Sequence, residues 1–464
     1  MRKNIILDTD FYKLCHPKAL KPGITGMYEY IENRIGKQPI MQIAGIGAII
    51  HEHFLNPVTQ EMIDEAVEES IMGGGYNLIN EEVWQKVMKL GYLPLRIKSL
   101  PEGTIVRGGT AYLTVEETEE WFAPFVGQFE ALFQHSWSPS AVATRSFLMK
   151  KNIKPYYELS CDNLNNLDFA VNDFGFRGDK WYEAAAMDGF GHLINFPGSD
   201  NIAASRAVIK DIYGYKGRLK SVWATEHSVA MSFGRNHELD YVMHQLNNAP
   251  DNAHISIVID AFDQDNFVKE IACHPDVIAK QASRTGRLIW RPDTGDKYIN
   301  IPKYSDIVAA ANTYHINRKG YKVINNNTGF IQGDDIDETV PNLYAEYTKA
   351  GWSADNLVTG SGGGLLVKGL TRDTHRIVMK PSQMRFGDEI VNVQKTPLSD
   401  PTKNSKLGRV KTTSSLHGFI TIESGKMPEA QFMGYQDCLE TIYENGVFNR
   451  PNFLDIINTA NKFL

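Results

Sequence analysis

A strand-like apolar segment followed by a polar or glycine-rich turn recurs seven times between residues 167 and 364. The segments are LDFAVNDFGFRG (167–178), GHLINFPGSD (191–200), SVWATEHS (221–228), HISIVIDAFD (254–263), RLIWRPDTGD (287–296), TGFIQGDD (328–335) and NLVTGSGGG (356–364). Helix-like segments such as NIAASRAVIKDIYG and SDIVAAANTYHI separate several of them. Strand, turn and helix in this order are typical of a parallel α/β domain, and the number of repeats favours a barrel. In such barrels the chemistry gathers in the loops that follow the strands.

The rest of the chain has a different pattern. The segment PLRIKSLPEGTIVRGGTAYLTVEE (94–117) alternates between turn signals, as a β-meander does, and similar alternation returns after about Lys380. Between these parts, FEALFQHSWSPSAVATRSFLMKKNI (129–153) predicts a long helix interrupted near Pro139. We therefore predict an α/β fold with an irregular parallel (β/α) barrel over residues 161–380. Residues 1–160 together with 381–464 are expected to form a discontinuous, mixed, β-rich second domain.

Composition limits the classes of partner. The net charge of the 464 residues is −7, whereas a protein that binds nucleic acid normally presents a basic face. The apolar run in the opening residues MRKNIILDTDFYKLCH is too short for a secretory leader, and no segment approaches the ~20 apolar residues of a membrane span. The cysteines match no zinc or disulfide pattern. We expect a soluble cytoplasmic protein that binds neither nucleic acid nor membrane.

The segment LVTGSGGGLL (357–366) holds four glycines within five residues. It fits neither nucleotide-binding fingerprint, because Leu365 stands where the dinucleotide motif needs its third glycine and no Gly-Lys-Ser/Thr follows. Consecutive amides without a Cβ can still face an anion, most simply a phosphate at the start of a helix. A tight strand-to-helix turn is the alternative.

Charged residues follow several of the predicted strands. Arg291 and Asp293 in RPDTG offer a fork for phosphate or carboxylate and an acceptor for sugar hydroxyls, although an internal ion pair is equally compatible. Asp260 and Asp334 add acids at the same edge. Carboxylates that face one opening repel each other unless a cation, a metal ion or sugar hydroxyls lie between them. Solvated loop acids are the alternative.

Other candidates have equally open alternatives. In DFGFRG, Phe174 can present a ring face to a planar ligand and Arg177 a charge, or the ring can pack in the core. His227 in WATEHS is either functional or structural. A local basic stretch is either a solvated loop or a clamp for polyphosphate. Its members are Lys395, Lys403, Lys406, Arg409 and Lys411.

Nine motifs carry a resemblance to a known family. They are DTDFYK, DFGFRG, GSD, ATEHS, RPDTG, IQGDD, GSGGGLL, LTRD and DPTKNSKLGR. In this order and approximate spacing, they resemble those of the nicotinamide phosphoribosyltransferases, from Asp8 to about Tyr435. The resemblance implies an enzyme that joins nicotinamide to phosphoribosyl pyrophosphate, giving nicotinamide mononucleotide and pyrophosphate. It also implies Mg²⁺ as cofactor, ATP as co-substrate and a homodimer with shared active sites.

The resemblance further implies roles for individual residues. Phe174 would stack on one face of the nicotinamide ring and Tyr12, from a second subunit, on the other, while Asp200 would accept from the carboxamide. His227 matches the histidine that ATP phosphorylates, and it belongs to an implied catalytic group with Asp260, Arg291 and Asp293. The other implied substrate-binding residues are Arg177, Ser256, Gly333, Asp334, Gly362, Gly363, Arg372 and Lys380. Pyrophosphate or ATP would contact Arg34, Lys395 and Arg409. The metal ligands stay unassigned.

Two alternative functions remain open at this point. A nicotinate phosphoribosyltransferase of the same fold is one, and a non-catalytic binding protein that retains the pocket is the other. The carboxylate of Asp200 accepts from an amide NH2 but repels the carboxylate of nicotinic acid, which favours nicotinamide.

Overall fold

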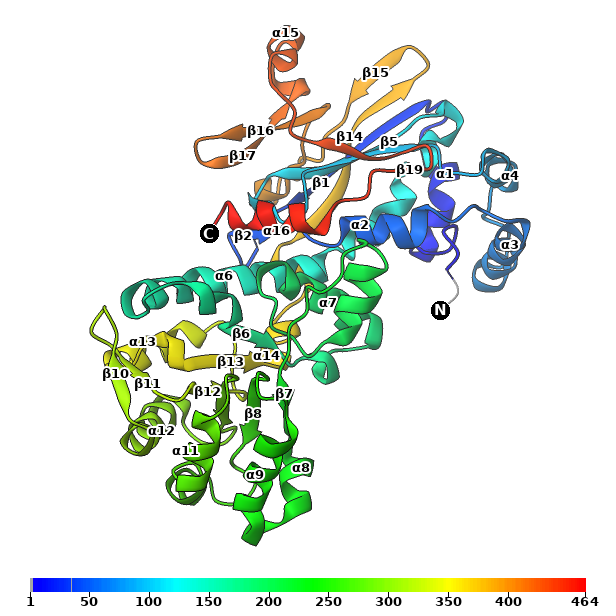
Figure 1. Cartoon of the computed structure of the whole chain (residues 1–464). Coiled ribbons are helices and arrows are strands. Elements are labelled where there is room, and N and C mark those ends of the chain that lie inside the picture. Colours follow the sequence, from blue (N-terminus) through cyan, green and yellow to red (C-terminus); the bar gives the residue numbers. More distant parts are fainter. Residues whose placement is uncertain (1–2, 35) are drawn as a thin grey trace. The chain divides into compact units, whose positions relative to one another are not determined.

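The computed structural model of the chain describes residues 3–34 and 36–464 (Figure 1). The described chain divides into two compact units. Unit 1 contains the chain up to Thr144, Val208–Tyr215 and Leu370–Phe463, and unit 2 contains Arg145–Ala207, Lys216–Gly369 and Leu464. These boundaries differ from the predicted residues 160 and 380. One reason is that α6 (Trp137–Ser160) runs across the first junction, so its apolar pattern does not mark a boundary.

Unit 2 is built on a parallel sheet in the order β6-β13-β12-β9-β8-β7. Its strands are β6 (Val171–Asp173), β7 (Trp223–Ala224), β8 (Ile255–Val258), β9 (Leu288–Arg291), β12 (Thr328–Gln332) and β13 (Leu357–Ser361). Each predicted segment except 191–200 holds one of these strands. Strands β8 and β12 are buried at every position, as expected for parallel strands covered on both faces.

The segment 191–200 corrects the prediction in part. Its apolar first half continues α7 (Tyr182–Asn195), because a short apolar run is compatible with a buried helix as well as with a strand. Its second half is extended: Ser199 forms a parallel bridge with Asp173, and Gly198 forms one with Lys220, just before β7. These bridges link the two ends of the sheet, which confirms the irregular parallel barrel.

Helices and short strands connect the strands of this sheet. The helices are α8 (His227–Phe233), α9 (Glu238–Asn248), α10 (Gln264–Asn266), α11 (Pro275–Ala282), α12 (Lys297–Asn312), α13 (Val340–Lys349) and α14 (Gly363–Leu366). A hairpin of β10 (Tyr314–Ile316) and β11 (Lys322–Ile324) follows α12. Since the carboxyl ends of parallel strands meet at one edge, the loops that lead into these helices lie together.

Unit 1 contains an antiparallel sheet in the order β15-β14-β1-β5-β3-β18-β19. Its strands are β1 (Gly26–Asn33), β3 (Leu95–Ser99), β5 (Ala111–Glu117), β14 (Ile377–Phe386), β15 (Glu389–Asn392), β18 (Glu440–Glu444) and β19 (Val447–Phe448). Two further pairs are β2 (Ile40–Gln42) with β4 (Ile105–Arg107), and β16 (Val410–Ser415) with β17 (Gly418–Glu423). The sheet therefore joins the predicted meander to strands from the other end of the chain.

The helices of unit 1 pack around an aromatic-rich core. They include α1 (His16–Ala19), α2 (Ile46–Ile49), α3 (Gln60–Gly74), α4 (Glu81–Leu90), α5 (Glu130–Gln134), α15 (Glu429–Met433) and α16 (Phe453–Asn461). In the core, the ring of Trp84 lies edge-on to Phe122 and Phe125, with centroids 5.9 and 5.8 Å away. The predicted helix break lies at His135–Ser136, and Pro139 falls in the first turn of α6, where proline is tolerated. Among the described helices, none combines the length and the apolar character needed to cross a bilayer.

Glu29 is a buried carboxyl within this sheet. It lies on β1, paired in register with Val115 and Pro381. Burial, reinforced by the nearby Glu130, raises the pKa of Glu29 to about 7. Its ionisation is therefore coupled to folding.

We predict that the wild-type protein loses stability relative to a Glu29→Gln variant as the pH rises. An acid whose pKa is raised by folding stabilises the fold fully below its unfolded pKa, and this contribution is lost as the pH rises through about 7. The difference in free energy of unfolding, measured with urea at about pH 5 and about pH 8, should shift by on the order of 2 kcal/mol toward the variant. If the difference in free energy of unfolding between the two proteins were the same at both pH values, the raised pKa of Glu29 would be contradicted.

Candidate active site

The carboxyl edge of the parallel sheet in unit 2 gathers most of the predicted site residues. Phe174 and Arg177 follow β6, and Asp200 follows the bridged segment. His227 follows β7 and Asp260 follows β8, while Arg291 is the last residue of β9 and Asp293 comes after it. Gly333 and Asp334 follow β12, and Gly362 and Gly363 follow β13. These strands belong to one sheet, and Figure 1 labels β6, β7, β8, β12 and β13. Ser256 differs, because it lies buried inside β8, where its carbonyl accepts from the amide of Thr225 at 3.0 Å.

His227 and Asp260 form a hydrogen-bonded pair. The Nε2 atom of His227 lies 3.0 Å from Oδ1 of Asp260, and the hydroxyl of Thr294 donates to the other carboxylate oxygen. The Asp260 side chain is only 5% exposed, whereas the imidazole of His227 is 46% exposed. Asp260 is thus fixed from two sides and orients an accessible ring at the start of α8.

Arg291, Asp293 and Gly333 form the next group. The Nε atom of Arg291 lies 3.4 Å from Oδ2 of Asp293. Burial raises the pKa of Asp293, and the carboxylate of Asp260 adds to this rise while Arg291 opposes it. A Cβ at position 333 would lie 2.5 Å from Oδ1 of Asp293, so a larger residue there would displace this carboxylate. Within the described residues, this Oδ1 atom and the Nε of Arg291 are buried without a hydrogen-bond partner, as atoms that serve a ligand would be.

These groups supply a candidate metal site. One ligand atom each from His227, Asp260 and Asp293 lies within 4.8 Å of the others. Carboxylate oxygens suit Mg²⁺, and the unpartnered Oδ1 of Asp293 fits such a ligand. Asp334 is a further acid at this edge and is exposed, whereas its neighbour Asp335 is paired with Lys297.

Asp173 fixes the backbone beside the proposed ring pocket. Its buried carboxylate accepts from the amide of Gly175 at 2.7 Å, and its carbonyl accepts from the amide of Asp200 at 2.9 Å. Burial raises the pKa of Asp173 to about 6. Phe174 is half-buried, and the exposed carboxylate of Asp200 accepts from the hydroxyl of Ser221. The triplet Asp-Phe-Gly thus brings the backbone that carries Phe174 next to the backbone that carries Asp200 in unit 2.

The glycine segment serves two purposes. A Cβ at Gly360 would lie 1.9 Å from the ring of Phe174, and one at Gly364 would lie 2.2 Å from a backbone oxygen in the loop after β12. At Gly362 and Gly363 a Cβ would meet only ordinary contacts, at 3.8 and 3.5 Å. Close packing therefore requires the outer glycines, whereas the inner two leave bare backbone at the N-terminus of α14.

The remaining predicted residues lie in unit 1. Tyr12 is 58% exposed on the short 3-10 helix Phe11–Cys15. The side chain of Arg34 donates to Glu32 at 3.1 Å, and Arg372 lies 3.6 Å from the carboxylate of Asp373. Lys380 on β14 forms an ion pair with Glu130 at 3.2 Å, and Lys395 is exposed.

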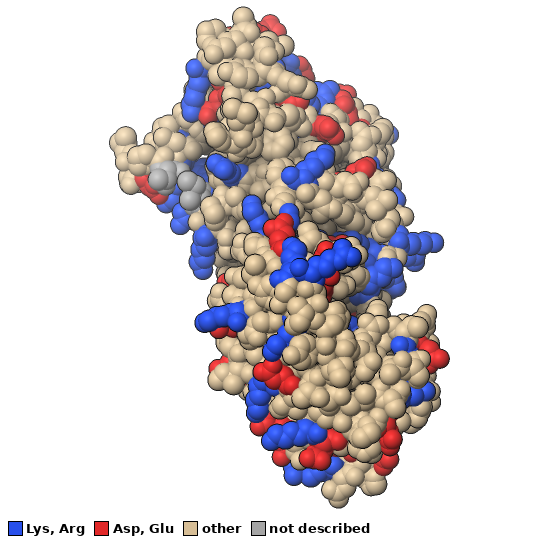
Figure 2. All heavy atoms as spheres, turned by 60° about the vertical axis from the view of Figure 1, so that its left-hand side comes forward, with Lys and Arg blue, Asp and Glu red and all other residues tan. Residues whose placement is uncertain are grey.

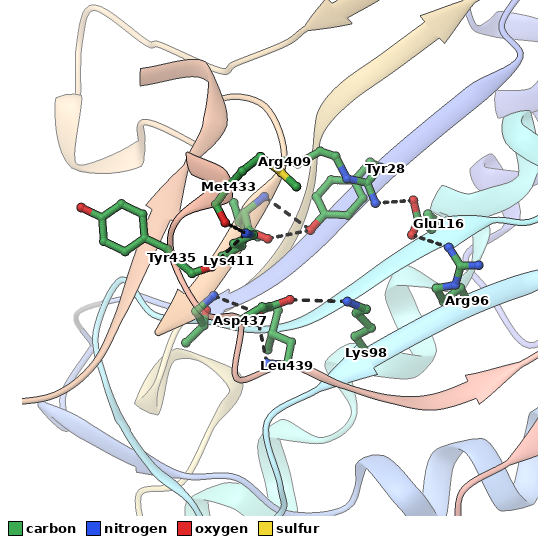
Figure 3. A network of polar contacts seen from close by, with 12 residues as sticks. Tyr28, Arg96, Lys98, Glu116, Arg409, Lys411, Met433, Tyr435, Asp437 and Leu439 are labelled. Carbon is green, nitrogen blue, oxygen red and sulfur yellow. Dashed lines mark hydrogen bonds and ion pairs between the residues drawn. The ribbon is translucent and has the colours of Figure 1, made fainter. Parts of the chain in front are cut away.

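The basic stretch fits neither of its two alternatives as a whole. Arg409 forms an ion pair with Glu116 at 2.6 Å, and its guanidinium lies 4.2 Å from the ring centroid of Tyr28. Figure 3 draws these three side chains. Lys411 donates to backbone oxygens, and Lys403 and Lys406 form ion pairs at 3.1 and 3.4 Å. These side chains are held by unit 1 itself. Charges of both signs are interspersed on the face drawn in Figure 2.

Comparisons with known proteins agree with this geometry. The model of the Nicotinate phosphoribosyltransferase (NAPRTase) family matches residues 169–424, and that of the Nicotinamide phosphoribosyltransferase, N-terminal domain, matches residues 4–97. A protein of Xanthomonas campestris pv. campestris named nicotinamide phosphoribosyltransferase is 31% identical over 464 residues, covering 96% of this chain and 95% of the relative. The chain belongs to the nicotinamide phosphoribosyltransferase family. A member named likewise from Acinetobacter baylyi is 27% identical over 495 residues, covering 98% and 96%.

Solved structures support the fold of this family member. The nicotinate-nucleotide pyrophosphorylase of Pyrococcus furiosus aligns with a TM-score of 0.59 at 14% identity, covering 100% of this chain and 96% of the other. Human nicotinic acid phosphoribosyltransferase aligns with a TM-score of 0.52 at 14% identity, covering 98% and 93%. The two family models and the curated relatives confirm the resemblance that the ordered motifs carry.

Some contributors to the site had no role in the sequence prediction. Thr294 belongs to the motif RPDTG and Asp173 to DFGFRG. The sequence of these motifs does not show that Thr294 binds Asp260 or that Asp173 binds the amide of Gly175. Ser221 reaches Asp200 across the bridge between segments, a pairing that local sequence does not reveal.

We predict that Gly360→Ala displaces the ring of Phe174 and lowers stability by about 1–3 kcal/mol, because the added methyl group overlaps the ring. Thermal unfolding measures the loss, and a crystal structure of the variant shows the ring. Gly363→Ala is the matched control, since its Cβ meets only Val367 at 3.5 Å. Equal stability of the two variants would refute the packing argument.

Proposed function

We propose that this protein is a nicotinamide phosphoribosyltransferase of NAD salvage, which forms nicotinamide mononucleotide and pyrophosphate from nicotinamide and phosphoribosyl pyrophosphate. The observation that carries the choice of base is Asp200. Its carboxylate is exposed, and its backbone amide donates a hydrogen bond to the carbonyl of Asp173, the residue before Phe174. A carboxylate beside a ring-stacking side chain accepts from a carboxamide and repels a carboxylate.

The reaction needs charge stabilisation more than acid–base catalysis. Displacement at the anomeric carbon builds positive charge on the ribose and negative charge on the leaving pyrophosphate. The ring nitrogen of nicotinamide is uncharged and has no proton to lose. The protein therefore has to orient the substrates and stabilise the developing charges.

The residues divide this work by their chemistry. Asp293 and Asp334, beside Gly333, would accept from the ribose hydroxyls, and the arginines would neutralise pyrophosphate. The amides at Gly362 and Gly363 would receive the 5′-phosphate. The cations proposed for the phosphates are Arg34, Arg177, Arg291, Arg372, Lys380, Lys395 and Arg409. For Arg409 this role requires it to exchange its ion pair with Glu116 for a ligand.

Mg²⁺ fits the donor set of Asp260 and Asp293, and when bound it would neutralise charge on the leaving group. The unpartnered buried oxygen of Asp293 supports this placement. Asp260 and Asp293 also hold the side chains of His227 and Arg291 close to the same position.

We also propose a homodimer with shared active sites, in the cytoplasm. Exposed aromatic side chains support a contact with a second chain, because such groups are enriched in interfaces. They include Tyr12, Phe176, Trp181 and Tyr182. The free thiols of the cysteines support a reducing compartment.

The decisive experiment offers nicotinamide and nicotinic acid at equal concentration with phosphoribosyl pyrophosphate and Mg²⁺, and detects the mononucleotides by mass. We expect the nicotinamide product to predominate. Preference for nicotinic acid would establish the alternative enzyme, and the absence of product from either base would favour a binding protein.

In the same assay, Asp200→Asn should shift the ratio of kcat/KM values toward nicotinic acid by about tenfold, since it removes a repelling charge that water partly screens. Asp276→Asn, an exposed acid on α11, is the control.

We propose that ATP stimulates synthesis by phosphorylating His227. The γ-phosphoryl group would pass to a ring nitrogen and ADP would leave. Asp260 supports this role because its carboxylate, 3.0 Å from Nε2 of His227, fixes the orientation of the accessible ring. The resulting phosphate would add an anion beside the proposed Mg²⁺ and pyrophosphate positions.

We predict that His227→Ala abolishes stimulation by ATP while a slow synthesis remains, because binding and the other charges persist. Initial rates with and without ATP measure the effect. His237→Ala, an exposed histidine paired with Asp240 in the same unit, should keep the stimulation. Stimulation of the His227 variant would exclude the phosphohistidine.

A further inference from the structure

Glu130, the first residue of α5, lies between two lysines within unit 1. Its Oε2 atom lies 2.5 Å from Nζ of Lys13, and its Oε1 atom lies 3.2 Å from Nζ of Lys380. The side chains of Lys13 and Glu130 are 7% and 19% exposed, so water screens their interaction only weakly. Burial alone would raise the pKa of Glu130, but the two lysines outweigh it and hold the pKa below its usual value. One ionised carboxylate thus binds two cations from distant parts of the sequence.

Lys13 connects this carboxylate to Tyr12. The two residues are neighbours in the chain, and Nζ of Lys13 lies 5.9 Å from the centroid of the Tyr12 ring. The ring of His16 meets the Tyr12 ring edge-on, with centroids 5.3 Å apart. Tyr12 is nevertheless mostly exposed. Its ring is therefore supported on the side of Lys13 and His16 and leaves a large area accessible.

Lys380 is the second cation that the carboxylate orients. It lies on β14 opposite Tyr30, and its ammonium also donates to the carbonyl of Met379 at 2.6 Å. A lysine side chain is flexible, so a fixed anion that holds it in one position reduces the entropy lost when it binds a ligand. Glu130 supplies that anion.

We propose that Glu130 is a positioning residue for the reaction described above: a single carboxylate sets the Tyr12 ring through Lys13 and also sets the ammonium of Lys380. The inference rests on the proposed function, in which Tyr12 contacts nicotinamide and Lys380 contacts the sugar phosphate. Its consequence is that the binding of both substrates depends on one side chain that touches neither.

Steady-state kinetics with both substrates tests this arrangement. Glu130→Gln keeps the size of the side chain and removes its charge, so the KM values for nicotinamide and for phosphoribosyl pyrophosphate should both rise, each by about tenfold, the scale of one charge-assisted contact. Lys13→Met should raise only the KM for nicotinamide, and Lys380→Met only that for phosphoribosyl pyrophosphate. In the Lys13→Met background, Glu130→Gln should leave the KM for nicotinamide without a further rise.

Glu120→Gln is the matched control, because Glu120 forms a more exposed ion pair with Arg385, at 3.2 Å, in the same unit. Its KM values should equal those of the wild type. The proposal is overturned if Glu130→Gln lowers the melting temperature but changes neither KM. It is also overturned if the effect on nicotinamide is equally large with and without Lys13. If the wild-type protein forms no mononucleotide, the proposed function fails. A crystal structure of Glu130→Gln still decides the inference in that case, since unmoved Tyr12 and Lys380 side chains would refute it.

Discussion

The bridge between Asp173 and Ser199, together with the one between Gly198 and Lys220, links the ends of the parallel sheet in unit 2, and the candidate site depends on it. The amide of Asp173 donates to the carbonyl of Gly198 at 3.1 Å, and its carboxylate accepts from the hydroxyl of Ser199. A buried carboxylate is tolerated there because backbone amides and hydroxyls satisfy it. Phe174 follows Asp173 and Asp200 follows Ser199, so the hydrogen bonds of the bridged pair fix the backbone positions of both residues. The proposed choice between two bases thus depends on hydrogen bonds that do not themselves touch a ligand.

At the neighbouring strand ends, by contrast, the protein itself satisfies the carboxylates only in part. Asp260, Asp293 and Asp334 gather at one edge, and the raised pKa of Asp293 shows that their mutual repulsion and burial are only partly offset by Arg291 and His227. Such an arrangement is unfavourable for the fold alone. It becomes favourable when sugar hydroxyls or a divalent cation lie between the carboxylates, which is the environment that the proposed reaction provides. In the proposed function, the charges of the substrates would therefore stabilise this group of carboxylates.

Sequence reasoning succeeded where a local pattern determines the structure. Strands such as β8 and β12 are short, apolar and bounded by polar turns, so their positions and the edge that carries the site were predictable. It failed where a partner far along the chain decides. The apolar residues 191–195 extend a helix, and the cations at 406 and 409 meet acids from β1 and β5. The role of Glu130 is not predictable from local sequence for the same reason, because neither of its lysine partners lies near it in the sequence.

The order of the strands in unit 1 has a consequence for synthesis of the chain. Strand β1 leaves the ribosome early, but its neighbour β14 begins only at Ile377, after every strand of the parallel sheet, and β18 follows later still. One edge of β1 and one edge of β3 therefore stay unpaired while the intervening barrel is synthesised, and each can form incorrect strand pairs during that time. We therefore expect the closure of contacts between the two ends of the sequence to be a slow step in the folding of this protein.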